Sequence, residues 1–275
     1  IDTNGVFAGF KVLNHHEPIF LHGLGEQPMF DFIDQYKGHS VKERYMIGGQ
    51  DNTPGITNFD GVTRATVSVL VINDTIIASA LKVARAKLEG FAAAASVQID
   101  TEFFEKLTFE QLLEQGHISH WQISNKESLQ LAENVSNELL SVIEDLIEES
   151  ETDRFIDLYF AFVNIPVVGK NLLGEEEYQR LLESLKPGEH ALMVFNRGIY
   201  AYVGEDFIPQ TVPTRLGIVQ AEFPVDIRDI DFYSYYDPSF KLEIPNFDLQ
   251  NIFRIKSQSG FQISQPFDIA LAVNY

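Results

Sequence analysis

Residues 59–66 read Phe59-Asp60-Gly61-Val62-Thr63-Arg64-Ala65-Thr66, and a largely apolar stretch from Val67 to Leu88 follows them. Apolar residues recur in this stretch at a spacing near 3.6, which predicts a helix. They are Leu70, Ile77, Leu81, Ala84 and Leu88. The small and hydroxylic residues before the helix are typical of a turn. Thr66 is therefore predicted to lie at or just before a helix N-terminus.

A helix start of this kind suits an anion. The first backbone amides of a helix have no acceptor within the helix and carry a partial positive charge. A phosphate placed there accepts their hydrogen bonds, and a threonine hydroxyl at the same point can be esterified by that phosphate. The simpler interpretation is that Thr66 only caps the helix. The residues alone leave both interpretations open.

The stretch from Asp60 to Thr66 resembles the flavinylation motif D-x-x-[ST]-G-A-T of FMN-binding domains. Such domains occur in sodium-pumping quinone reductases, Rnf complexes and NosR proteins. In them the last threonine carries FMN through a phosphoester that a separate flavin transferase makes. The resemblance implies that Thr66 is the attachment point and that Asp60, Thr63 and Ala65 are the other motif members.

Arg64 stands where the motif has glycine. The arginine could pair with the phosphate, or its presence could mean that this turn does not need a positive φ. Val67 and Ser68, in the first turn of the expected helix, complete the candidate FMN site.

Other stretches resemble one branch of this family, the NosR-type proteins. Asn14–Leu21 contains His-His-Glu-Pro-Ile, similar to the H-H-E-P-I segment of NosR, where the quinone-reductase relatives have E-T-P-G. Further similar stretches follow in the same order as in the periplasmic region of NosR. They are residues 155–159, 169–174, 185–188 and 265–271. The resemblance covers nearly the whole chain.

The histidine-rich segment supplies candidate neighbours for the flavin ring. His16, Glu17 and Pro18 match the motif position, so we expect a titratable group near the isoalloxazine that tunes its potential or proton uptake. The alternative is that His15, His16 and Glu17 form only the hydrogen-bonded end of a strand before Pro18.

The resemblance implies a periplasmic flavin module on the periplasmic face of the bacterial inner membrane. It would pass electrons from the membrane part of the same protein to a periplasmic acceptor, rather than act as an independent catalyst. The expected partners are the flavin transferase, that membrane part, and nitrous oxide reductase or its maturation factors. The alternative function, from a different class, is a sensory or docking module that works by protein contact without flavin.

Composition narrows the remaining possibilities. The net charge of −20 disfavours direct binding to DNA or RNA, and the absence of cysteine excludes disulfides, iron–sulfur clusters and thiol nucleophiles. We see no apolar run near the roughly 20 residues of a membrane helix, and we expect the gene product to extend upstream. His117 and His120 are interpreted as loop histidines. Gly169–Gly174 lacks the Lys-[Ser/Thr] of a P-loop.

The pattern predicts an α+β fold in three parts. An FMN-binding domain of the quinone reductase and Rnf type is expected over residues 1–95, a helical segment over 96–150, and a strand-rich α/β unit over 151–275. The elements that we expect are two strands within 1–22, helices at 25–37, 102–116, 127–150 and 174–185, a strand at 156–163, a hairpin over 191–203, and short strands after 207.

Overall fold

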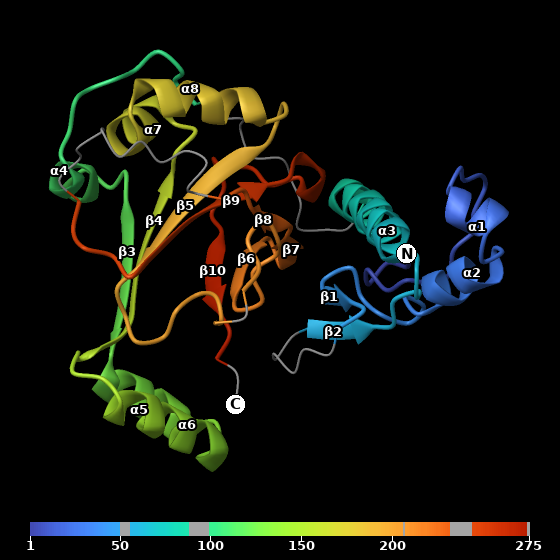
Figure 1. The fold of residues 1–275 in the computed structure, drawn as a ribbon, viewed down its shortest axis with the longest axis horizontal. Coiled ribbons are helices and arrows are strands. Elements are labelled where there is room, and N and C mark those ends of the chain that lie inside the picture. Colours follow the sequence, from blue (N-terminus) through green and yellow to red (C-terminus); the bar gives the residue numbers. More distant parts are fainter. Residues whose placement is uncertain (50–55, 88–98, 206, 232–243, 274–275) are drawn as a thin grey trace. The chain divides into compact units, whose positions relative to one another are not determined.

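The computed structural model describes residues 1–49, 56–87, 99–205, 207–231 and 244–273 (Figure 1). Over these residues the fold is α+β, as predicted. The chain forms two compact units, each made of separate stretches. One comprises Ile1–Ser96, Ile218–Val225 and Gln258–Ala270, and the other Val97–Gly217, Asp226–Ser257 and Leu271–Tyr275. The predicted division at residues 95 and 150 stays a prediction, as does the FMN-domain type.

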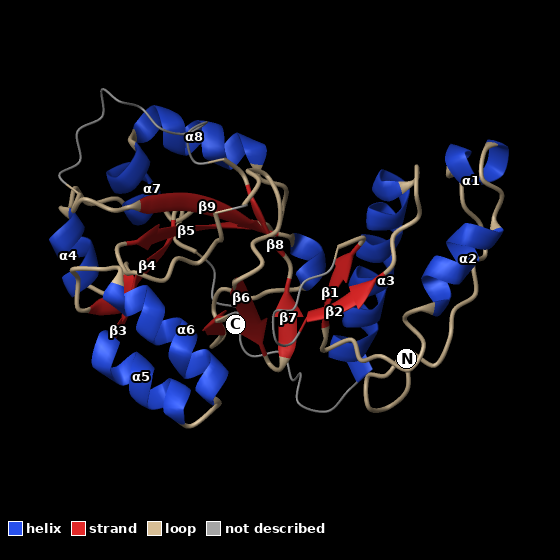
Figure 2. Ribbon diagram, turned by 60° about the horizontal axis from the view of Figure 1, so that its bottom comes forward, coloured by secondary structure: helices blue, strands red, loops and turns tan. Residues whose placement is uncertain are grey.

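The first unit is built around one long helix and a pair of short strands. Strands β1 (Arg44–Ile47) and β2 (Ile56–Phe59) pair in parallel, and helix α3 (Thr66–Lys87) lies along them (Figures 1 and 2). Helices α1 (Pro18–His22) and α2 (Gln27–Asp34) precede this pair. Two predicted helices of this unit are confirmed. Helix α2 lies within the expected range 25–37, and α3 matches the expected range 67–88 as far as the described residues reach.

Aromatic rings dominate the core of this unit. Tyr36 is fully buried, and its ring centroid lies 4.6 Å from that of Phe59 and 5.8 Å from that of Phe32. Helix α3 contributes Val69, Leu81 and Ala84 to the same cluster. Both halves of α3 thereby pack into the core that contains Tyr36 and Phe59.

The two strands expected within residues 1–22 are wrong. The carboxylate of Asp2 accepts hydrogen bonds from the backbone of Asn4 and Val6, so a local side-chain turn replaces a hairpin. Val6 makes only an isolated bridge to Ser40. Pro18 then begins helix α1, a position where its missing N–H costs nothing.

Helix α3 is long and apolar enough to cross a membrane by length and composition alone, with a mean hydropathy of 1.7 over its best 18-residue window. The expectation that no such stretch exists is therefore wrong. Asp74 and Lys82 interrupt the apolar run in the sequence, but the average over the helix stays high. Of that window, 22% is buried inside the structure.

The second unit is organised on an antiparallel sheet of order β3–β4–β5–β9–β8 (Figure 1). Its strands are β3 (Ser119–Ser124), β4 (Arg154–Phe162), β5 (His190–Asn196), β9 (Leu249–Ile255) and β8 (Ile227–Asp229). A separate three-stranded sheet, β10–β6–β7, is formed by β6 (Leu216–Gln220), β7 (Phe223–Val225) and β10 (Asp268–Leu271), and most of its residues belong to the first unit. Strand β4 and the short strands after 207 were predicted.

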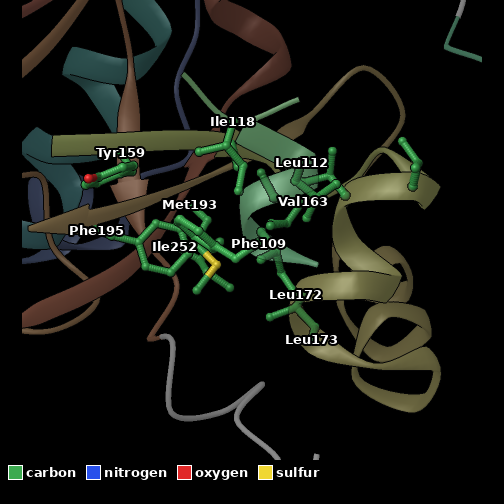
Figure 3. Packing of buried hydrophobic residues seen from close by; sticks show 14 of the residues in the cluster. Phe109, Leu112, Ile118, Tyr159, Val163, Leu172, Leu173, Met193, Phe195 and Ile252 are labelled. Carbon is green, nitrogen blue, oxygen red and sulfur yellow. The ribbon is translucent and has the colours of Figure 1, made fainter. Parts of the chain in front are cut away.

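Helices α4 (Phe109–Glu114), α7 (Pro166–Leu173) and α8 (Glu175–Ser184) pack on one face of the five-stranded sheet (Figure 3). Their side chains meet alternate residues of β4 and β5, such as Tyr159, Met193 and Phe195. Helices α5 (Asn125–Glu133) and α6 (Asn137–Glu148) pair with each other next to β3. The 3-10 turn Ser257–Ser259 follows β9.

Three expectations for this part of the chain need correction. The helix expected at 102–116 is shortened to α4, because Thr108 and Gln111 form a capping box there. The helix expected at 127–150 is two helices, since Ser136 caps a new start with its side chain. The second strand of the expected hairpin is absent: the backbone of Tyr200 bonds to Phe155 instead.

Candidate functional site

The residues of the flavinylation motif form a tight turn that leads into α3. The amide of Ala65 donates to the carbonyl of Val62 over 2.9 Å, which leaves Thr63 and Arg64 in the middle of the turn. Arg64 has a φ of 70°. A positive φ at the third residue is the mark of a type II turn, where glycine is favoured. The interpretation that this turn does not need a positive φ is therefore wrong.

Thr66 is the first residue of α3 and is exposed. Its neighbour Ala65 is only 4% exposed, and the Ala65 carbonyl accepts the first helical hydrogen bond, from Val69. The chain is thus anchored at Ala65 while the next residue faces solvent. Asp60, Thr63 and Arg64 are also exposed.

The start of α3 has the features that a phosphate requires. Its first turn contains Thr66, Val67 and Ser68 and no acidic residue, so no carboxylate competes for the free amides. Val67 is 76% exposed, and Ser68 is half-buried. Leu70 and Val71 extend the exposed apolar surface one turn further. These residues fit a phosphate ester at residue 66 with an apolar ring system beside it.

Two contacts that the sequence did not predict hold the front of this turn. The side chain of Gln35 accepts a hydrogen bond from the Asp60 amide over 2.7 Å and donates to the Asp60 carbonyl over 3.1 Å. Gly61 lies so close to Gly48 that a Cβ on it would come within 3.2 Å of the Gly48 Cα. The beginning of the motif is therefore tied to the end of α2 and backed by the end of β1.

The residue after Gln35, Tyr36, makes a hydrogen bond to helix α3, which follows the turn. The hydroxyl of Tyr36 donates to Asn73 Oδ1 on α3 over 2.7 Å. Burial, with the carboxylate of Asp74 nearby, raises the pKa of Tyr36 well above its usual range. The hydroxyl consequently stays protonated and keeps donating over the physiological range.

His16, Glu17 and Pro18 lie at the start of α1, not at a strand end. The Glu17 carbonyl accepts from the amides of Phe20 and Leu21. His15 contacts Glu26 over 2.9 Å, and its Nδ1 is buried without a partner. Among the described residues, no hydrogen bond or ion pair joins positions 16–18 to positions 60–68. The role of these three residues beside a flavin ring stays a prediction.

A second polar cluster lies on the other unit. Asp157 is fully buried in β4, and its carboxylate faces Arg154 Nε at 3.2 Å, Arg197 Nε at 3.0 Å and His120 Nε2 at 2.6 Å. The His120 ring stacks on Tyr159 with centroids 4.1 Å apart. His120 is thus a strand residue of β3, not a loop histidine. Its neighbours explain its position as the partner of a buried acid.

The glycine-containing segment that was set aside in the sequence has a structural explanation. A Cβ on Gly169 would lie 2.0 Å from the Val163 carbonyl oxygen and 2.4 Å from the Tyr178 ring, so this glycine permits close packing of α7. Asp229 accepts hydrogen bonds from Gln210, Asp231 and Asn251. Within the described ranges, no group of three or more His, Asp or Glu side chains is arranged to hold a metal ion.

Three curated proteins are similar to this chain along almost all of it. The regulatory protein NosR of Stutzerimonas stutzeri is 31% identical over 99% of the chain, and that of Pseudomonas aeruginosa is 29% identical over 99%. The protein NirI of Paracoccus denitrificans is 25% identical over 98%. The chain spans 38%, 38% and 37% of the lengths of these relatives.

No protein-family model matches the chain. No solved structure matches it either.

Proposed function

We propose that this NosR-type chain is an FMN-carrying electron-transfer domain, with the cofactor bound to Thr66 through a phosphoester. Two of the relatives are named as regulatory proteins. We further propose that the domain lies on the periplasmic face of the bacterial inner membrane and supports nitrous oxide reductase in denitrification.

The observation that carries the proposal is the position of Thr66. Its side chain is exposed at the first residue of a 22-residue helix, after a turn that buries Ala65, and the first turn of that helix contains no acidic residue. A helix N-terminus stabilises an anionic ester through its free amides and its dipole. The exposed guanidinium of Arg64 adds a positive charge to the same turn.

The attachment reaction makes limited demands on this chain. The Thr66 Oγ1 forms a bond to the flavin-bearing phosphorus of a flavin dinucleotide, the phosphoanhydride bond from that phosphorus breaks with a nucleoside monophosphate as leaving group, and the hydroxyl proton passes to a base of the transferase. The role of the chain is to present the hydroxyl and to hold the resulting phosphate. The bound FMN would supply the redox chemistry.

Covalent attachment suits the proposed location. A phosphoester does not dissociate, so the domain keeps its cofactor where no pool of free FMN replaces it. Val67, Leu70 and Val71 offer exposed apolar surface to a ring system tethered at Thr66. The partners that follow from the proposal are the flavin transferase, the membrane part of the same protein as electron donor, and nitrous oxide reductase or its maturation factors.

Mass spectrometry of the chain co-produced with a flavin transferase tests the proposal. The wild-type chain is expected to gain the mass of one FMN less one water. Thr66→Val keeps the shape of the side chain and is expected to remove the gain, whereas Thr66→Ser keeps a hydroxyl and is expected to retain it. Peptide mapping then distinguishes Thr66 from Thr63 and Ser68. Modification of Thr66→Val at the wild-type level would overturn the assignment.

The same substitution, made in the full-length protein, distinguishes this function from that of a flavin-independent docking module. The full-length protein carrying Thr66→Val is expected to lose its support of nitrous oxide reduction in cells. Full support by that unmodified variant would show that the domain acts by protein contact alone.

A further inference from the structure

We propose that Gln35 and Tyr36 are positioning residues that set the geometry of the turn at Thr66 for flavin transfer. The inference rests on the proposed function, because it concerns how efficiently the transferase modifies the same hydroxyl. Neither residue belongs to the flavinylation motif. Both directly follow α2, at least 24 residues before that motif in the sequence.

The side chain of Gln35 makes a pair of hydrogen bonds to the backbone of Asp60. A single side-chain amide satisfies both the N–H and the C=O of one backbone unit, as a neighbouring strand would. This fixes the backbone of Asp60 in position and in rotation. Asp60 stands six residues before Thr66, at the start of the motif.

On the other side of Thr66, Tyr36 makes a hydrogen bond to Asn73. Asn73 stands seven residues after Thr66, about 10 Å further along the helix axis. Two consecutive residues thus hold the chain on both sides of the attachment point. The turn between them, with exposed Thr63, Arg64 and Thr66, is kept at a set place over the core.

We expect these contacts to affect the rate of flavin transfer more than the stability of the fold. Gln35 is half-buried and Asp60 is exposed, and hydrogen bonds that compete with water contribute little to the free energy of unfolding. Transfer to a hydroxyl depends far more steeply on placement, because the reacting atoms must be held within a fraction of an ångström. Loss of the Gln35 contacts is therefore expected to slow modification well before it unfolds the unit.

The test is the rate at which purified transferase modifies purified chain, followed by flavin fluorescence of the protein band. Gln35→Met keeps the length of the side chain and removes both hydrogen bonds. Its kcat for loading is expected to fall about tenfold, with KM for the chain nearly unchanged. Tyr36→Phe keeps the buried ring and is expected to act in the same direction. Melting temperatures of all variants are measured in parallel.

Two further variants separate positioning from general damage. Gln27→Met lies on helix α2 and removes only a local bond to Asp31, so its loading rate should equal that of the wild type. Gln35→Glu keeps the acceptor for the Asp60 amide and is expected to recover part of the rate. Equal loading of Gln35→Met and wild type would overturn the inference, and so would a rate loss matched by an equal loss in Gln27→Met.

Failure of the inference and failure of the proposed function give different results. If the wild-type chain is not modified at all, the proposed function fails. If the wild-type chain is modified at Thr66 and Gln35→Met is modified equally fast, only the positioning role fails.

Discussion

Arg64 has a left-handed backbone, with a φ of 70°, two residues before Thr66 opens α3. A side chain with a Cβ costs about 1 kcal/mol or more in this region, and glycine does not. We predict that Arg64→Gly keeps the fold and raises the free energy of unfolding by up to about 1 kcal/mol. Urea denaturation followed by circular dichroism measures this difference.

Arg64→Ala is the matched control for that variant. It also removes the guanidinium, but it keeps the Cβ and therefore the strain, so it should show no comparable gain. A stability of Arg64→Ala equal to that of Arg64→Gly would mean that the turn relaxes around a Cβ without cost. An insoluble Arg64→Gly would contradict its place in an exposed turn.

The parts of the site that depend on neighbours in the sequence could be predicted. The apolar periodicity after Thr66 predicted α3, and the small residues before it predicted the turn. The left-handed φ at Arg64 could not be inferred from arginine itself, because a non-glycine residue there carries no visible signal. The departure of Arg64 from the motif's glycine was the available hint.

The contacts that hold the site in place could not be predicted from the sequence. Gln35 and Asp60 are 25 residues apart, and neither belongs to a pattern that pairs them. The same limit explains β3, whose residues Ser119–Ser124 alternate poorly and become a strand by pairing with β4. The pair Asn4-Gly5 is typical of a hairpin turn, but the carboxylate of Asp2 forms a local turn with the backbone of Asn4 and Val6 instead.

The hairpin that joins β6 to β7 offers a second prediction. Ala221 and Glu222 form its two-residue loop, with φ values of 51° and 69°, which is the pattern of a type I′ turn. Asparagine tolerates this conformation better than alanine, so Ala221→Asn is expected to add about 0.5 kcal/mol of stability. Ala221→Val, with a branched Cβ, should lose stability in the same thermal denaturation assay. The reverse order of the two variants would argue against the turn type.

The buried carboxylate of Asp157 offers a third prediction. Asp157→Asn keeps the shape of the side chain but leaves the guanidinium groups of Arg154 and Arg197 without their counter-charge. Removing one partner of such a pair costs about 3 kcal/mol when both are buried, and somewhat less here because the arginines are partly exposed. We expect a loss of about 2 kcal/mol in chemical denaturation. Glu151→Gln, at an exposed acid nearby in the sequence, should change stability by less than about 0.5 kcal/mol.

The histidine at the start of β5 makes stability depend on pH. Burial lowers the pKa of His190, and its Nδ1 lies 3.2 Å from the amide nitrogen of Asn164, which donates to the neutral ring. Between the lowered folded pKa and the ordinary value of about 6.5, the unfolded chain binds more protons than the folded one. Protonation therefore favours unfolding, and stability falls as the pH drops below about 6.5.

Replacing this ring with an amide isolates its contribution. The glutamine in His190→Gln cannot titrate. Acidification should therefore lower the unfolding free energy of the wild type more than that of the variant. Because every other titrating group is common to the two proteins, the subtraction removes the contributions of those groups. Urea midpoints measured for both proteins from about pH 7.5 to about pH 5 give this difference, since the window brackets the ordinary pKa of the imidazole. A difference that is constant over the range would show that the His190 ring has the same proton affinity folded and unfolded, against the burial that separates it from water.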